Sequence, residues 1–199
     1  MIASSANLLP FKGLASRKMA LRPIVRYPDP VLTRPTKPVG EITAEIQALV
    51  EDMWETMYAA PGVGLAANQV GVSLRLAIID TTDGEEVDKR GRRIVLVDPV
   101  IVERRGKIYE EEGCLSFPGF TERVERPAWA HARARDLEGK EYEISGDGLL
   151  ARALCHEIDH LDGVPFINRM SALKRDLIKR KIRKLQKSGE WPEFPLTGA

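Results

Sequence analysis

The stretch CHEIDH at residues 155–160 carries two histidines four residues apart, with a glutamate directly after the first. An α-helix turns by about 100° per residue, so residues four apart lie on nearly the same face, one turn apart. His156 and His160 can therefore bind one metal ion while Glu157 lies beside it, close enough to transfer a proton. The alternative is a surface helix with two unrelated histidines, which is disfavoured because the chain has only three histidines.

The residues around this stretch predict a helix that begins near residue 148. Good helix formers follow Gly146-Asp147, a capping pair, and Asp162-Gly163 with Pro165 is a stop signal. Apolar residues recur at spacings of three and four, which predicts one buried stripe: Leu150, Leu154, Ile158 and Leu161. A metal-binding helix inside a core would supply the dry, shaped cavity that a catalytic site needs.

A catalytic metal site also needs a third protein ligand and an open position for water. The longer metalloprotease pattern H-E-x-x-H-x-x-G-x-x-H matches at Gly163 but requires a histidine where this chain has Phe166. Another metalloprotease class uses a downstream glutamate, and Glu190 and Glu193 are available only in a Pro-rich tail. The motif therefore leaves the third ligand open, and a better candidate must lie upstream.

Composition bounds the class of protein. With 199 residues, of which 43% are hydrophobic, the chain can bury one core and is expected to form one domain. A net charge of +1 does not favour a nucleic-acid-coating protein, so no DNA partner is expected. No apolar run approaches about 18 residues, so no membrane span is expected. The two cysteines, Cys114 and Cys155, are too few for a disulfide scaffold, which fits a reducing compartment.

Residues 1–18 show no apolar pattern typical of a core, and we expect them to be a leader outside it. Residues 1–20 contain serines, lysines and arginines and no acidic residue, a weak likeness to an organellar transit peptide. An over-long start, with Met19 as the natural first residue, is a further interpretation. We expect a cytoplasmic, bacterial-type protein and keep organellar targeting as the alternative.

Strands and one further helix are predicted before residue 148. A helix opens at Thr43, buries one face and ends at Pro61-Gly62. Strands are expected at residues 74–80, 94–102, 123–135 and 140–145, with Glu138-Gly139 as a turn and residues 82–93 as a surface loop. Strands with only two substantial helices, and no regular alternation of strand and helix, indicate an α+β fold.

Two further stretches lie between these elements. GVGLAANQVG at residues 62–71 lacks the lysine of a phosphate-binding loop and follows a helix, so its small residues are expected to allow close approach of a backbone or ligand. Gln69 is either a polar group held for function or a packed glutamine in a turn. EEEGCLSFPG at residues 110–119 places Cys114 in a constrained loop, where a free cysteine is compatible with simple packing. Cys155 is assigned to packing, because on a helix it points about 100° away from its histidine neighbour.

Three motifs together resemble the peptide deformylase family. They are GVGLAANQ at residues 62–69, EGCLS at 112–116 and HEIDH at 156–160, in the order that the family has them. The likeness includes the Tyr-Pro-Asp-Pro opening and runs from about Met19 to Arg169. It implies an α+β fold with mixed or antiparallel sheets packed around a central metal-binding helix, plus an N-terminal and a C-terminal helix.

The expected domain plan is a leader at residues 1–18, a catalytic domain at 19–168, and a basic C-terminal helix with its tail at 169–199. The resemblance implies metal-dependent hydrolysis of the N-formyl group from N-formylmethionine of newly made polypeptides, with release of formate. The expected partners are therefore N-formylmethionyl nascent peptides.

The resemblance also supplies the third metal ligand. Cys114, His156 and His160 would hold one divalent ion, with water in the fourth position. Fe²⁺ is the metal expected in the cell, and Zn²⁺, Ni²⁺ or Co²⁺ can occupy such a site. Glu157 would take a proton from the attacking water and pass it to the departing amine. The developing negative oxygen would be met by the Leu115 backbone N–H and the Gln69 side chain.

The same match implies further site residues. Those expected to bind substrate are Val63, Gly64, Gly113, Leu149 and Ala153, the last two in the pocket for methionine. Glu112 and Arg126 resemble a pair that fixes the ligand geometry from behind, unless Arg126 is an ordinary strand-surface arginine.

The chain departs from the family pattern at two positions. Cys155 stands where a glutamine often precedes the first ligand histidine, a change expected to be harmless. Thr121 stands where some members have a substrate-binding arginine, and Arg123 is the nearest replacement.

Residues 169–187 combine an apolar stripe with many basic residues. The apolar residues are Met170, Leu173, Leu177, Ile178, Ile182 and Leu185. The basic residues are Lys174, Arg175, Lys179, Arg180, Lys181, Arg183, Lys184 and Lys187, against the single acid Asp176. One interpretation is a solvated helix packed on the domain. The other is docking to ribosomal RNA, which the resemblance supports because some members use a C-terminal helix in this way.

Two rival functions remain open. A zinc metallopeptidase would cleave internal peptide bonds and release no formate, but Phe166 in place of a histidine disfavours it. A structural metal site on an RNA-binding domain would have four protein ligands and no bound water.

Overall fold

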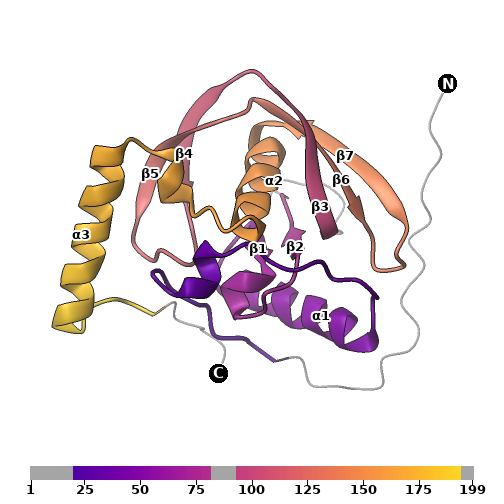
Figure 1. Ribbon diagram of the computed structural model, residues 1–199, viewed down its shortest axis with the longest axis horizontal. Coiled ribbons are helices and arrows are strands. Elements are labelled where there is room, and N and C mark those ends of the chain that lie inside the picture. The colour runs from indigo at the N-terminus through magenta and orange to yellow at the C-terminus, as the bar shows by residue number, and fades with distance from the viewer. Residues whose placement is uncertain (1–19, 82–92, 194–199) are drawn as a thin grey trace.

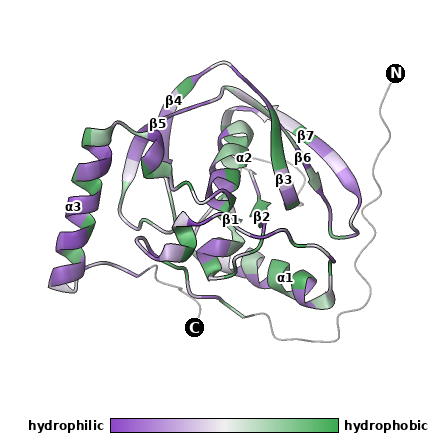
Figure 2. Cartoon of the chain, viewed as in Figure 1, coloured by the Kyte–Doolittle hydropathy of each residue, from purple (hydrophilic) through white to green (hydrophobic). Residues whose placement is uncertain are grey.

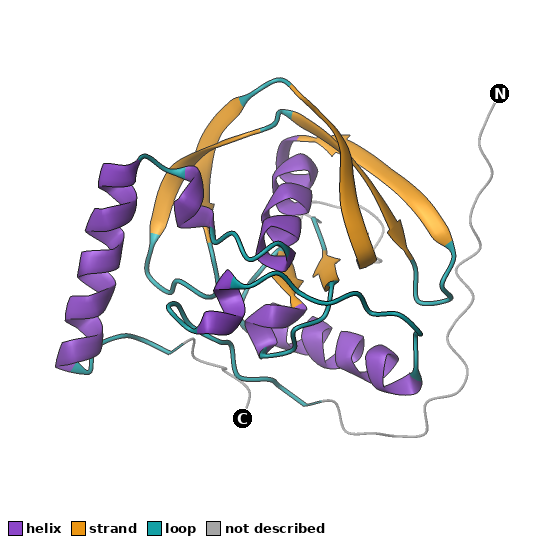
Figure 3. Cartoon of the chain, in the orientation of Figure 1, coloured by secondary structure: helices purple, strands orange, loops and turns teal. Residues whose placement is uncertain are grey.

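In the computed structural model, residues 20–81 and 93–193 are described. Within them lie the helices α1 (Ala44–Ala59), α2 (Gly148–Leu161) and α3 (Ala172–Ser188). The strands are β1 (Gly64–Ala66), β2 (Leu76–Ile79), β3 (Ile94–Arg105), β4 (Ile108–Gly113), β5 (Thr121–Arg126), β6 (Trp129–Arg135) and β7 (Glu141–Asp147). Three short 3-10 helices complete the list: η1 (Pro30–Thr33), η2 (Ala67–Val70) and η3 (Phe166–Arg169) (Figure 3). The leader expected at residues 1–18 and most of the loop 82–93 lie outside the described residues.

Two antiparallel sheets frame the helix α2. One sheet has the strand order β1-β2-β3-β6-β7, and the other consists of β4 and β5. In Figure 1, α2 lies in the middle of the molecule, with β4 and β5 on one side and β3, β6 and β7 on the other. The predicted α+β fold, with sheets packed around a central helix, is thereby confirmed.

The predicted strand at residues 123–135 is in fact two strands. β5 ends at Arg126 and β6 begins at Trp129, with Pro127 between them. Proline cannot donate a hydrogen bond to a strand ladder, so it marks an interruption. Here the chain changes sheets, since β5 pairs with β4 whereas β6 pairs with β3 and β7.

Residues 110–113, which the sequence placed in a loop, form the end of β4. The ladder with β5 runs from Ile108 opposite Arg126 to Gly113 opposite Thr121. Glutamate is depleted in strands, so three successive glutamates hid this strand from the sequence pattern. The loop prediction is correct only beyond Gly113, where a turn is closed by the Phe117 N–H donating to the Cys114 carbonyl over 2.8 Å.

The helix α2 begins and ends where the sequence indicates. Asp147 is the N-cap and Asp162 the C-cap. Its predicted stripe packs on the five-stranded sheet, with Leu154, Ile158 and Leu161 buried and Leu150 partly buried. Gly163 follows at φ 71°, and a Cβ there would lie 2.6 Å from the Arg34 backbone. Only glycine fits that turn.

The helix α1 packs under β1 and β2. Thr43 is its N-cap, as predicted, and its inner face is buried against the same core as Leu65 and Ile78. The residues of that face are Leu49, Val50, Met53, Trp54 and Met57. Among the described residues, no helix is long and apolar enough to cross a membrane.

The helix α3 lies on the outside of the molecule (Figure 1). Ser171 caps it, and Ile178 and Ile182 are buried against the aromatic cluster of Phe117, Phe120 and Phe166. Two residues of the predicted stripe face solvent instead, Leu173 at 69% and Leu177 at 53% exposure. Figure 2 shows α3 as mostly hydrophilic, with isolated apolar positions.

Candidate metal centre

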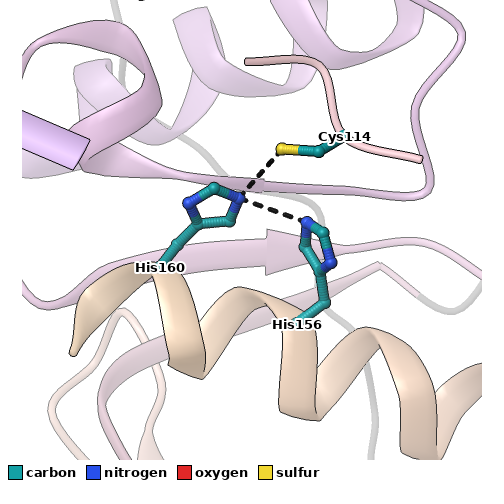
Figure 4. Close-up of side chains that lie close together, drawn as sticks. All are labelled: Cys114, His156 and His160. Atoms are coloured by element: carbon teal, nitrogen blue, oxygen red, sulfur yellow. Dashed lines mark hydrogen bonds between the residues drawn. The ribbon is translucent and has the colours of Figure 1, made fainter. Parts of the chain in front are cut away.

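Cys114, His156 and His160 bring three ligand atoms together (Figure 4). The Cys114 Sγ lies 3.1 Å from the His160 Nε2, which lies 3.2 Å from the His156 Nε2. All three atoms lie within 4.8 Å of one another. No other group of three or more His, Cys, Asp or Glu side chains converges in this way within residues 20–81 and 93–193.

Local structure explains why these three residues meet. His156 and His160 are one turn apart on α2, so both rings project from the same face, as the spacing predicted. Cys114 directly follows β4, which β5 holds in register through Gly113 opposite Thr121. The third ligand atom is therefore delivered by the two-stranded sheet rather than by the helix.

The donor set fits a divalent transition metal. Two imidazole nitrogens and one thiolate are the ligands that Zn²⁺, Fe²⁺, Co²⁺ and Ni²⁺ accept. Bonds of about 2.0–2.1 Å at a tetrahedral angle keep two nitrogen ligands about 3.3–3.4 Å apart. The separation of 3.2 Å between the two Nε2 atoms is close to that value.

Glu112 orients His156 from behind. Its Oε1 lies 2.6 Å from the His156 Nδ1, which leaves Nε2 directed at the ligand cluster. The same carboxylate accepts two hydrogen bonds from Arg126, at 2.8 and 2.5 Å. Arg126 is only 3% exposed, so it is a buried partner of Glu112 and not an ordinary strand-surface arginine.

The ion-pair network continues beyond Arg126. Its Nη1 donates to the Asp159 Oδ2 over 2.5 Å, and Arg169 donates to both oxygens of Asp159. Asp159 lies on α2 and Arg169 in η3, while Arg126 ends β5. Four charged side chains thus join the helix, the two-stranded sheet and the segment before α3.

These contacts shift the pKa values of the two histidines in opposite directions. Burial alone lowers the pKa of His156, but hydrogen bonds to Cys114 and Glu112 raise it well above its ordinary value. Burial and the neighbouring charge of His156 hold the pKa of His160 well below its ordinary value. Burial raises the pKa of Glu112, yet Arg126 and His156 outweigh that effect and keep it far below the usual range. Glu112 is therefore a fixed negative charge behind the site.

Glu157 is a buried carboxyl group beside the ligands. It is 3% exposed, and burial raises its pKa to about 7. A pKa near neutrality suits a group that accepts and then returns a proton. Its Oε2 is buried and makes no hydrogen bond to any described residue.

Gly64 leaves the space that Glu157 occupies. A Cβ at residue 64 would lie 2.3 Å from the Glu157 Oε1, far inside contact distance. The sequence indicated that small residues here permit close approach, and the approaching group is this carboxylate. β1 therefore contributes to the site through Gly64, whose missing side chain leaves room for the Glu157 carboxylate.

Gln69 is buried next to the cysteine. Its Oε1 accepts from the Ala66 N–H over 2.9 Å, which turns its amide nitrogen toward Ser116 at 3.3 Å and the Cys114 Sγ at 3.6 Å. The amide N–H groups therefore face the Cys114 sulfur.

A cavity of about 400 Å³ opens onto this cluster. Its walls include all five residues expected to bind substrate: Val63, Gly64, Gly113, Leu149 and Ala153. Glu157, Gln69 and Leu115 also line it. Val63 is 45% exposed at the rim, whereas Ala153 is buried inside.

Three other positions have clear outcomes. Thr121 lines the cavity, as the family position predicts. Arg123 does not line it: its guanidinium donates to the Tyr109 carbonyl and lies over the Tyr109 ring. Cys155 is buried against Ala130 and Ala151, in agreement with a packing role.

Sequence reasoning missed several residues around the site. Asp159 and Arg169 complete the ion-pair network, Ser116 faces Gln69, and Arg152 lines the cavity. Spacing could have identified Arg152, because it precedes His156 by one helical turn. Nothing in the sequence indicated that Ser116 and Gln69 would meet.

Comparisons with known proteins agree with this geometry. The family model described as polypeptide deformylase matches residues 21–176. The chain belongs to the polypeptide deformylase family. The peptide deformylase of Acidobacterium capsulatum is 55% identical to it over 173 residues, which are 87% of this chain and 100% of that protein.

Solved structures of deformylases have the same fold. A peptide deformylase from Legionella pneumophila is 45% identical, with a TM-score of 0.76 over 85% of this chain and 98% of that chain. The Ehrlichia chaffeensis peptide deformylase in complex with actinonin is 37% identical, with a TM-score of 0.78 over 85% of this chain and 99% of that chain. The family predicted from the three motifs, and with it the prediction of a hydrolase acting on N-formylmethionyl peptides, is confirmed.

Proposed function

We infer that this deformylase hydrolyses the formyl group of N-formylmethionine on new polypeptides with a divalent ion held by Cys114, His156 and His160. The observation that supports this assignment is the convergence of the three ligand atoms within 4.8 Å. A buried glutamate with a pKa raised to about 7 lies beside them in the same cavity. That arrangement provides a metal position, a proton carrier and room for a peptide.

The proposed mechanism assigns the proton steps to Glu157. A divalent ion, when bound, polarises the formyl carbonyl and acidifies water. Glu157 takes one proton from the water that attacks the formyl carbon and later gives it to the departing amine. Burial raises the pKa of Glu157, which favours its holding the proton between the two steps. Glu112 and Arg126 hold His156 in the orientation that keeps Nε2 on the ligand side.

Two hydrogen-bond donors are proposed for the oxygen that becomes negative. The Gln69 amide nitrogen is fixed by the Ala66 N–H and faces the sulfur of Cys114. The Leu115 N–H makes no hydrogen bond to another described residue. Donors fixed before reaction stabilise the developing charge without reorganisation.

We assign the peptide to the cavity above the ligands. Val63, Gly64 and Gly113 would flank its backbone, and Leu149 and Ala153 would contact the methionine side chain. Gly62, Phe117 and Phe120 also line the cavity. They present apolar rings or no side chain, and such a surface suits the apolar thioether side chain of methionine.

The experiment that tests the function measures formate release from formyl-Met-Ala-Ser by metal-loaded protein. We expect formate from this peptide and none from acetyl-Met-Ala-Ser, since the extra methyl group crowds the carbonyl carbon. Cleavage of an unblocked internal peptide bond without formate would support the metallopeptidase rival. A fourth protein ligand, seen by X-ray absorption at the bound metal, would support the structural-site rival.

We propose Fe²⁺ as the native metal. A thiolate donates more electron density than a third histidine would and suits Fe²⁺ as well as Zn²⁺. It is also open to oxidation. Protein loaded anaerobically with Fe²⁺ should therefore lose activity in air faster than protein loaded with Ni²⁺ or Zn²⁺. Equal loss for all three metals would contradict this assignment.

We propose that α3 docks the enzyme on the ribosome. Its outer face carries residues at spacings of four and three: Leu173, Leu177, Arg180, Lys184 and Lys187, all exposed. Lys174 and Lys181 are engaged elsewhere, with Glu122 and the Phe120 ring. The free basic residues could contact RNA phosphates, which releases counterions.

Deletion of residues 171–199 is a poor test of this docking. It would remove Ile178 and Ile182 from the aromatic cluster and destabilise the domain. The triple variant Arg180→Gln, Lys184→Gln, Lys187→Gln leaves those contacts intact. We expect it to bind ribosomes more weakly, with a salt dependence reduced by about one unit of slope per lost phosphate contact, and to process short formyl peptides normally. Unchanged ribosome binding would refute the proposal.

We propose residues 19–168 as the catalytic domain, a cytoplasmic location, and residues 1–18 as dispensable. The family match from residue 21 supports that first boundary. A chain starting at Met19 should show normal turnover and thermal stability. Fusion of residues 1–20 to a fluorescent protein tests the alternative, organellar import.

A further inference from the structure

One charged side chain in the cavity, Arg152, has no role in the mechanism proposed above. Among the described residues that line it, Arg152 is the only lysine or arginine. The family position for a substrate-binding arginine holds Thr121, and Arg123 is directed away onto Tyr109. Arg152 reaches the same cavity from a different element, α2.

The position of Arg152 on α2 relates it to the metal ligands. It precedes His156 by four residues, so its Cα lies roughly 6 Å further along the same helix face. Its Nη1 donates to the Glu111 carbonyl over 3.3 Å, which brings the guanidinium against β4 on the opposite wall. The side chain thus lines the cavity while it contacts the backbone of the strand.

Arg152 has no acidic partner among the described residues. Within the described residues, no carboxylate forms an ion pair with it. Glu111 also lines the cavity, but it stands directly opposite Arg123 in the ladder. No ion pair joins Glu111 to Arg123 among the described residues, since the Arg123 guanidinium donates to the Tyr109 carbonyl. Glu112 is engaged by Arg126, and Glu157 lies beside the metal ligands.

We propose that Arg152 determines substrate preference by binding a carboxylate on the second or third residue of the formylated peptide. The inference rests on the deformylase function proposed above. A formyl group at the metal ligands fixes the start of the peptide, and an extended chain advances about 3.3 Å per residue. The Arg152 guanidinium, one helical turn from His156, would therefore lie beside the residues that follow methionine. Its aliphatic stem can contact the methionine side chain while its charge faces the next residues.

The test compares peptides that differ in one charge. Formyl-Met-X-Ser-amide and formyl-Met-Ser-X-amide are prepared with X as Glu, Gln or Lys, and kcat and KM are measured by formate release. For at least one position of X, the wild-type enzyme should prefer Glu to Gln by about 2–5-fold, the effect of a partly exposed ion pair. The preference should lie in KM with kcat unchanged, because the contact is equal in ground and transition states. It should shrink at high salt.

Two variants isolate the guanidinium. Arg152→Met keeps the apolar stem and should process all three peptides equally well. Arg152→Glu should prefer Lys to Glu. Arg123→Met removes the same charge outside the cavity and should retain the wild-type preference for Glu.

The outcomes separate this inference from the function on which it rests. Formate release from the Gln peptide without any charge preference, or a preference that survives in Arg152→Met, refutes the role of Arg152 alone. Loss of the preference in Arg123→Met would also refute it. Absence of formate release from every peptide refutes the deformylase function and this inference with it.

Discussion

The helices α2 and α3 look alike as apolar patterns but differ in how they are enclosed. On α2, Glu157, Asp159 and His160 are 5% exposed or less. On α3, only Ile178 and Ile182 are buried, and the charged residues face solvent or lie at its margins. An apolar stripe at helical spacing therefore predicts that one face packs, but says nothing about the other faces.

The buried polar groups mark the difference. Removing a charged or polar group from water costs free energy unless partners compensate it. On α2 that cost is met by the arginine pair at Asp159 and by the ligand cluster at His160. On α3 only Ile178 and Ile182 are buried, so no buried charge on this helix needs such partners. The chemistry should therefore depend strongly on α2 and its immediate contacts, and weakly on α3.

The largest effect is expected at Cys114, the proposed ligand, which follows the two-stranded sheet and lies next to the histidines of α2. Cys114→Ala should lose metal affinity and activity together, because two histidines alone bind the ion weakly. Metal content by mass spectrometry and formate release provide the measurement. Cys155→Ala, on the packing side of α2, is the matched control and should lose little of either. If Cys155 proves essential and Cys114 dispensable, the ligand assignment is wrong.

The next largest effect is expected at Glu157. Glu157→Gln should bind metal and keep its thermal stability, but turnover should fall by about 10²–10⁴-fold, the usual contribution of general acid–base catalysis. Asp176→Asn makes the same chemical change on α3 and should leave turnover unaltered. Near-normal kcat in Glu157→Gln would reject this residue as the proton carrier.

A smaller loss is expected where β1 touches α2. Gly64→Ala places a methyl group 2.3 Å from the Glu157 Oε1, so the carboxylate must move. Displacement of a catalytic group by about 1 Å can cost about 10²-fold in rate. Gly113→Ala adds a methyl group elsewhere in the same cavity, where the new Cβ would lie 3.3 Å from a Thr121 methyl group and not against Glu157. Steady-state kinetics of both variants, with unchanged metal content, would measure the difference; equal kcat would contradict the steric argument.

The smallest effect is expected on the outer face of α3. Leu177→Ala should change the free energy of unfolding by less than about 0.5 kcal/mol, as at most exposed positions. Leu154→Ala makes the same truncation on α2, where the side chain is 0% exposed, and should cost about 2–5 kcal/mol. Urea denaturation of both variants gives the two values. Similar costs would mean that α3 is packed against something that covers Leu177.

The sequence predicted the helices and the ligand spacing because those signals are local. Caps at Thr43 and Asp147, and the turn at Gly163, depend on residues a few positions apart. The strand β4 was missed although its partner β5 follows closely in the chain, because its three glutamates are residues that strands usually lack. Pro127 was the local signal for the break between β5 and β6, and it was not used.

Much of the candidate site depends on contacts that no local pattern encodes. The meeting of Arg126 with Asp159, 33 residues away, and of Gln69 with Ser116, 47 away, follows from the packing of separate elements. Cys114 was identified as a ligand only through the family resemblance. Arg152 could have been found from its helical spacing to His156, but its contact with the Glu111 carbonyl could not.

The missing side chain at Gly64 also constrains how resistance to an inhibitor of this cleft can evolve. A codon change at residue 64 forces a Cβ against the Glu157 carboxylate, so escape there would sacrifice turnover. Val63, which is 45% exposed at the rim, can change without meeting that carboxylate. Selection under a cleft-binding drug should therefore recover substitutions at Val63 and leave residue 64 a glycine.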